Sequence, residues 1–178
     1  MKKSDIYLFL GVAVLLVIAL SKKIQNSLKG YTGLSGGNYP DEISNRIFVQ
    51  AKKRGLSDRL SALVVAWSKF ETGNYGSHFV KDNRNLFGYT YDKNSKYQTG
   101  YNGSNPKAGN FAVYASLEDS VNEVIDWMKR RQSRQDRGPW PSLDAINDPI
   151  EFARLLMAAN YSDDHYTVYG AGIKSHLV

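Results

Sequence analysis

A predicted helix over residues 57–71 that ends in a glycine-rich turn constrains the fold more than any other feature of this chain. Its apolar residues recur at steps of three and four, so one face of the helix must be buried; they are Leu60, Leu63, Val64 and Trp67. Ser57 is a predicted N-cap, and Gly73 lies where such a helix stops. The segment therefore predicts a core helix that carries the carboxyl group of Glu71 in its last turn.

The surroundings of Glu71 favour a protonated carboxyl group. In the last turn, Glu71 lies beside the negative end of the helix dipole and next to Phe70 and Trp67. Both effects disfavour the ionised form, so we expect a raised pKa for Glu71. A carboxyl group that stays neutral near pH 7 can serve as a general acid. An ordinary solvated glutamate is the alternative for a lone residue of this kind.

Three further motifs follow Glu71-Thr72-Gly73 along the chain. They are Asn85-Leu86-Phe87-Gly88, the segment from Phe111 to Ser120, and the segment from Ala158 to Tyr166. Together, in this order, the four motifs resemble the β-N-acetylglucosaminidase family of the lysozyme superfamily, glycoside hydrolase family 73 of the flagellar and autolysin type. The resemblance covers roughly residues 41–178. It implies an α+β fold, a mainly helical lysozyme-like domain with a small β-hairpin lobe.

The resemblance also implies catalytic roles. Glu71 would be the general acid, and Tyr161 would lie near it as a catalytic residue in the C-terminal motif. Similar enzymes carry a second acidic residue in the hairpin region, but residues 97–114 contain no Asp or Glu. Asp92, just before the hairpin, is the predicted substitute, and Asp82 is the alternative. Two routes without a second carboxylate stay open: the N-acetyl group of the substrate could act as the nucleophile, or the enzyme could be a lytic transglycosylase, which needs only one carboxylate.

Six residues near these motifs are predicted to contact substrate. Phe87 and Tyr89 offer rings on which sugars stack, although packing in the core explains them equally well. The full set is Asn74, Tyr75, Asn85, Phe87, Tyr89 and Tyr166. Asn85 has a second interpretation, in which it holds the backbone of its own loop.

Charge and composition exclude several classes of protein. The net charge of +6 is concentrated in residues 1–40, which hold five lysines and one aspartate, so residues 41–178 are close to neutral. A nucleic-acid partner is therefore not expected. Cysteine is absent, and His78, His165 and His176 lack metal-ligand spacing, so neither a metal nor a cofactor is expected. Five basic residues between 129 and 137 are interpreted as the C-terminal end of a helix.

The N-terminus contains an uninterrupted apolar run over residues 6–20. Fifteen residues of helix span about 22 Å, short of the roughly 30 Å hydrocarbon core, and flanking lysines extend the reach. We predict a membrane anchor helix in residues 1–23, contacting lipid through 6–20, with a cleaved signal peptide as the alternative. A flexible linker over 24–40 and a glycan-cleaving domain over 41–178 follow. The catalytic domain would then face the periplasm or the exterior.

Local sequence patterns predict the remaining secondary-structure elements. A loop is expected over 74–85, short strands over 89–91, 97–101 and 110–114, and a helix from Ser116 to about Arg131. Asp148-Pro149 predicts a further helix start, and Ser162 is the predicted cap of the last helix.

The sequence thus predicts an enzyme that cuts the β-1,4 bonds of peptidoglycan glycan strands. A phage virion enzyme and a bacterial wall-opening enzyme both suit the layout. The competing hypothesis is a non-catalytic protein that is anchored in a membrane or virion and grips glycan without cutting it.

Overall fold

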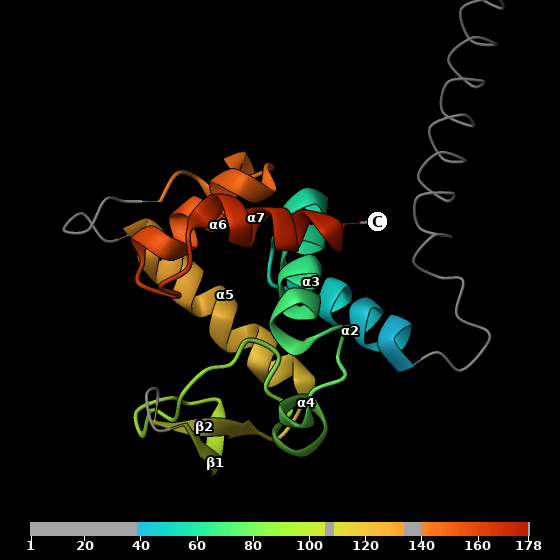
Figure 1. The fold of residues 1–178 in the computed structure, drawn as a ribbon, viewed down its shortest axis with the longest axis vertical. Coiled ribbons are helices and arrows are strands. Elements are labelled where there is room, and N and C mark those ends of the chain that lie inside the picture. The colour runs from blue at the N-terminus through green and yellow to red at the C-terminus, as the bar shows by residue number, and fades with distance from the viewer. Residues whose placement is uncertain (1–38, 106–108, 134–139, 178) are drawn as a thin grey trace, which may run out of the picture. The chain divides into compact units, whose positions relative to one another are not determined.

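The structure is a computed structural model, and it describes residues 39–105, 109–133 and 140–177 (Figure 1). The chain divides into two compact units, Met1–Glu42 and Ile43–Val178. The second unit contains nearly all of the described residues. The predicted anchor and most of the predicted linker lie outside them.

The described part contains six α-helices, one short 3-10 helix and two strands. In chain order they are α2 (Tyr39–Lys53), α3 (Asp58–Thr72), α4 (His78–Asn83), β1 (Gln98–Asn105), β2 (Gly109–Tyr114), α5 (Leu117–Ser133), η1 (Leu143–Ala145), α6 (Pro149–Ala158) and α7 (Tyr166–Ser175).

Helix α3 forms where the sequence predicts it and lies in the core. The Ser57 hydroxyl accepts a hydrogen bond from the Leu60 N–H at 3.2 Å, which caps the start of the helix. Gly73 ends it at φ +57°, a left-handed conformation that costs glycine little. The predicted apolar stripe is fully buried, including Trp67. Glu71 therefore occupies the last turn of a rigid helix.

Two other helix starts follow the predicted capping chemistry. The Ser116 hydroxyl accepts from the Asp119 N–H at 3.1 Å before α5, and it donates to the Asp119 carboxylate at 2.7 Å. The Asp148 carboxylate accepts from the N–H groups of Ile150 and Glu151 at 2.9 Å, which caps α6 behind its first-turn proline.

Two local predictions were wrong. The predicted cap Ser162 lies before the start of α7, whose N-cap is His165. The Ser162 hydroxyl instead bonds the Asp164 carboxylate at 3.1 Å. The predicted loop over 74–85 contains a further short helix, α4, because Val80 packs into the core and Arg84 ends the helix in a left-handed conformation.

The sheet has two antiparallel strands, β1 and β2. The expected third strand near residue 90 is reduced to a single bridge between Thr90 and Phe111. The Tyr91 N–H donates to the Asn110 carbonyl at 2.7 Å, so the segment entering the lobe runs beside β2.

Helix α3 packs against α7. Figure 1 shows α5 running from the β2 side of the domain toward α6, and α4 lies against β2. Helix α7 packs along α6 and also contacts α3. The C-terminal end of α3 therefore meets segments from the middle and the end of the chain.

The predicted fold class needs one correction. The described residues are mainly helical with a small two-stranded sheet, but the class also included an N-terminal transmembrane helix. Among residues 39–105, 109–133 and 140–177, no helix is both long and apolar enough to cross a bilayer. The apolar run that prompted the prediction, residues 6–20, lies outside these ranges.

Candidate active site

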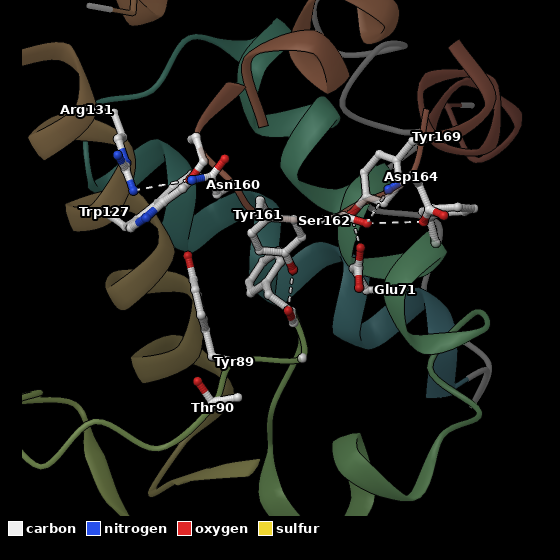
Figure 2. A pocket seen from close by; sticks show the side chains of 14 residues that line it. Glu71, Tyr89, Thr90, Trp127, Arg131, Asn160, Tyr161, Ser162, Asp164 and Tyr169 are labelled. Carbon is white, nitrogen blue, oxygen red and sulfur yellow. Dashed lines mark hydrogen bonds between the residues drawn. The ribbon is translucent and has the colours of Figure 1, made fainter. Parts of the chain in front are cut away.

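A pocket of about 490 Å³ lies at the C-terminal end of α3. Its volume falls in the range of small-molecule binding sites. Four parts of the chain line it: Phe70 and Glu71 from α3, residues 87–90, Trp127 and Arg131 from α5, and residues 159–162, 164 and 169 near the C-terminus. Figure 2 shows Glu71 and Tyr169 toward one side, Trp127 and Arg131 toward the other, and Tyr161 between them.

The Glu71 carboxyl group is partly buried, and its two oxygens have different neighbours. Oε1 accepts a hydrogen bond from the hydroxyl of Tyr169. Oε2 faces Gly88: a Cβ added to this glycine would lie 3.8 Å from Oε2. Gly88 itself lines the pocket, so Oε2 is the oxygen on the side of that wall.

The environment of Glu71 raises its pKa to about 7 from an ordinary value of 4.5. Desolvation by burial is the largest cause. The polar N–H of the nearby Trp67 side chain acts in the opposite direction, and the negative charge of Asp164 adds to the rise. At neutral pH a substantial fraction of Glu71 is therefore protonated, as a general acid requires.

Tyr161, from the C-terminal motif, lines the pocket and lies between its two sides (Figure 2). Its ring packs edge-on against Trp67, with centroids 4.8 Å apart. Its hydroxyl donates to the Phe87 carbonyl. Burial, followed by the charge of Glu71, raises the pKa of Tyr161 well above its usual value, so the phenol stays neutral. The bond to Phe87 ties the C-terminal segment to residues 87–90.

Asn85 holds the backbone of residues 87–90 in place. Its side-chain amide donates to the carbonyls of Tyr89 at 2.8 Å and Ala112 at 3.2 Å. Its side-chain carbonyl accepts from the N–H groups of Phe87 at 3.4 Å and Tyr89 at 3.1 Å. Asn85 is fully buried and does not line the pocket. The geometry supports the interpretation in which it fixes its own loop.

Phe87 and Tyr89, two predicted substrate contacts, line the pocket. The Phe87 ring packs on Trp67 with centroids 4.7 Å apart, so most of it belongs to the core. The Tyr89 ring lies edge-on to Tyr161 at 6.1 Å, and its buried hydroxyl has no hydrogen-bond partner among the described residues.

The other predicted substrate contacts are not among the lining residues. Asn74 is exposed, and its N–H donates to the Lys69 carbonyl in the turn that closes α3. Tyr75 is buried in the core, where its hydroxyl bonds Ser44 at 3.2 Å. Tyr166 is 38% exposed at the start of α7.

Asp92, the predicted second carboxylate, is also not a lining residue. It is exposed, and its carboxylate accepts from the Asn94 N–H at 2.9 Å within a local turn. Its own N–H donates to the Gln98 side chain at 2.7 Å. These bonds explain Asp92 as a turn residue.

The sequence analysis assigned no site role to several pocket residues. Asp164 lies near enough to Glu71 for its negative charge to raise the pKa of Glu71, and the Tyr169 hydroxyl donates a hydrogen bond to Glu71. Trp127 and Arg131 come from α5, with the guanidinium 5.3 Å from the centre of the indole ring. Arg131 was predicted only as part of a basic helix end, and it also donates to the Ala159 carbonyl at 3.3 Å.

The arrangement combines a carboxyl group with a raised pKa, a second carboxylate and aromatic walls. These are the groups that glycosidic bond cleavage uses, because a proton must reach the leaving oxygen while the sugar becomes cationic. Among the described residues, no group of three or more His, Asp or Glu side chains is placed to hold a metal ion.

Comparison with known structures agrees with this fold. A peptidoglycan hydrolase from Sphingomonas sp. A1 has a TM-score of 0.54 at 21% identity, over 73% of this chain and 88% of that one. The catalytic domain of the autolysin Auto from Listeria monocytogenes has 0.52 at 20% identity, over 85% and 90%. A type VI secretion effector–immunity complex from Pseudomonas protegens has 0.54 at 12% identity, over 78% and 90%.

Sequence comparison places the chain in a family. No match is found among curated protein sequences. Residues 49–177, most of the chain and the whole of the pocket, match the glucosaminidase family, described as mannosyl-glycoprotein endo-β-N-acetylglucosaminidase. This is a family of glycoside hydrolases, as the sequence motifs predicted. The chain therefore belongs to the glucosaminidase family.

Proposed function

We propose that this protein hydrolyses β-1,4 bonds in the glycan strands of peptidoglycan, with Glu71 as the general acid. The single observation that carries the proposal is the position of Glu71, whose carboxyl group lines the pocket and has a pKa raised to about 7. Family membership supports a glycosidase. Two proteins of similar fold, named as a peptidoglycan hydrolase and an autolysin, support the wall glycan as the substrate.

The acid step follows from this geometry. Protonated Glu71 transfers its proton to the glycosidic oxygen as the bond between that oxygen and the anomeric carbon breaks. The bonding electron pair leaves with the oxygen, which departs as a neutral hydroxyl group. Water then adds to the anomeric carbon and gives up a proton to a carboxylate. The net change is one glycosidic bond broken and one water consumed.

Asp164 is the best-placed candidate for the second carboxylate. It lines the same pocket, whereas Asp92 does not. Its carboxylate accepts one hydrogen bond from Ser162 and is exposed, so it stays accessible to water and substrate. In the proposed reaction, Asp164 stabilises the cationic sugar or takes the proton of the attacking water. The catalytic domain would act where wall glycan lies, in the periplasm or outside the cell.

The test is digestion of purified peptidoglycan by the full-length protein and by Glu71→Gln. The wild type should release soluble fragments, and the variant should lose at least about a hundredfold in rate, because general acid catalysis contributes about 10²–10⁴. Glutamine keeps the size and one acceptor oxygen but has no acidic proton.

Mass spectrometry of the fragments separates the alternatives. Hydrolysis predicts fragments with a reducing N-acetylglucosamine end. Anhydro ends, lighter by one water, would instead indicate a lytic transglycosylase that uses Glu71 alone. Equal cleavage by both proteins would contradict the role of Glu71. Binding without cleavage by either would favour a non-catalytic glycan-binding protein.

A further inference from the structure

Tyr169 contacts the proposed acid although it lies on α7, 98 residues further along the chain. Its ring is 2% exposed and packs edge-on against Phe70, with centroids 4.9 Å apart. Figure 2 shows Tyr169 directly beside Glu71, with the hydrogen bond drawn between them. A buried tyrosine on a separate helix that bonds the acid is a candidate for holding it in place.

Two glycines allow α7 to reach this position. A Cβ on Gly172 would overlap the ring of Phe70 on α3. A Cβ on Gly170 would lie 2.9 Å from the Ile150 Cα on α6, closer than real Cβ contacts come. Helix interiors normally disfavour glycine by about 1 kcal/mol relative to alanine, so two of them beside Tyr169 indicate close packing. The α7 backbone on which Tyr169 lies is therefore held close to the Phe70 ring on one side and to α6 on the other.

The direction of the hydrogen bonds follows from the chemistry of the three groups. The Trp67 indole Nε1 donates to the Tyr169 oxygen at 2.9 Å, and an indole N–H can only donate. The Tyr169 oxygen is thus an acceptor toward Trp67, and its own hydrogen is available for Glu71 Oε1. The chain of donors runs from Trp67 through Tyr169 to Glu71.

This direction decides which oxygen of the protonated acid carries the proton. An oxygen that already accepts the Tyr169 hydrogen is best suited as the carbonyl oxygen of a neutral carboxyl group. The other oxygen, Oε2, faces Gly88 in the pocket wall. We propose that Tyr169 is a positioning residue that holds Glu71 through Oε1 and so presents the acidic proton on Oε2 to the glycosidic oxygen.

Other groups near Glu71 do not replace this contact. Asp164 repels the ionised carboxyl group, and the Tyr161 hydroxyl is already bonded to the Phe87 carbonyl. The Tyr89 hydroxyl makes no hydrogen bond with the described residues. Trp67 favours the ionised form, but its N–H is also the donor that orients Tyr169.

The proposal rests on the proposed function, and Tyr169→Phe tests it in the full-length protein on soluble peptidoglycan fragments. We expect kcat to fall about tenfold to a hundredfold with KM within about twofold, because the substrate still binds but the acid is misplaced. The hydroxyl favours the ionised carboxylate, so its loss should move the alkaline limb of kcat/KM upward by about one pH unit. A purely structural role would leave that limb unchanged.

Tyr114→Phe is the matched control. It also removes a buried hydroxyl that donates to a carboxylate, Glu123 at 2.6 Å, but Tyr114 does not line the pocket. Its pH profile should keep the wild-type alkaline limb. The positioning role alone would be overturned if the wild type is active, Glu71→Gln is inactive and Tyr169→Phe has the pH profile of the wild type. An inactive wild type would instead overturn the proposed function.

A second measurement needs neither activity nor a Tyr169 variant. In Glu71→Gln, the introduced side-chain amide must place its carbonyl toward the Tyr169 hydroxyl and its NH₂ where Oε2 was. NMR should then show nuclear Overhauser contacts from the NH₂ protons of this amide to the Gly88 α protons. Contacts from that NH₂ group to the Tyr169 ring instead would overturn the assignment of the two oxygens.

Discussion

Replacing Glu71 by glutamine should make the folded protein more stable at high pH. The folded-state pKa of about 7 lies above the ordinary value of 4.5, so the native state binds a proton that the unfolded chain releases. The stability from this group is fully present below pH 4.5 and is lost as the pH rises through 7. The gap of about 2.5 pKa units, at about 1.4 kcal/mol per unit, corresponds to about 3.5 kcal/mol.

Glutamine stays neutral at every pH and keeps an oxygen that can accept from Tyr169. Near pH 4 the two proteins should therefore differ little in their free energy of unfolding. Between pH 4.5 and 7 the wild type should lose about 1.4 kcal/mol per pH unit relative to the variant. At pH 8 the variant should be more stable by up to about 3.5 kcal/mol, measured by urea unfolding followed by circular dichroism.

Glu118→Gln provides a control of opposite sign. Hydrogen bonds from the Arg46 guanidinium, at 2.7 and 2.8 Å, hold the pKa of Glu118 below its usual value. The stability from Glu118 is present above pH 4.5 and is lost as the pH falls, so its glutamine variant should be less stable at pH 8. Two results would refute the claim that burial raises the pKa of Glu71. One is a Glu71→Gln protein that is less stable than the wild type at pH 8, and the other is a stability difference that is the same at pH 4 and pH 8.

Two further substitutions test the surroundings of the acid. Asp164→Asn removes a negative charge that raises the pKa of Glu71, so the midpoint of a carboxyl ¹³C NMR titration of Glu71 should move to lower pH; an unmoved midpoint would contradict the coupling. Asn85→Ala leaves the Phe87 and Tyr89 N–H groups without their side-chain acceptor. It should lower the free energy of unfolding, measured in urea, by at least about 2 kcal/mol. An unchanged free energy of unfolding would contradict the role of Asn85 in the loop.

The position of Glu71 could be predicted because every signal for it is local. The apolar stripe of α3, the cap at Ser57 and the stop at Gly73 all lie within residues 57–73. Such patterns report backbone preferences over one helix, and the structure follows them. The direction of the Glu71 pKa shift agrees with the prediction, but its causes differ in part. Burial is the largest cause, and the Trp67 side chain lowers the pKa rather than raising it.

The partners of Glu71 could not be predicted in this way. Tyr169 lies 98 residues after Glu71 and reaches it only because α7 packs against α3. The spacing of apolar residues within one helix cannot predict such a contact. The available signal was the pair Gly170 and Gly172 inside a helix. Asp92 was chosen by its closeness in sequence to the hairpin, whereas Asp164 shares the pocket through the turn before α7.

The most direct measurement of the central claim is a carboxyl ¹³C NMR titration of Glu71 in the full-length protein, with Glu71→Gln used to assign the signal. We expect a midpoint near pH 7, together with an alkaline limb of kcat/KM at the same pH. A midpoint near 4.5 would show a solvated carboxylate that is ionised at neutral pH, and it would contradict the role of Glu71 as the acid.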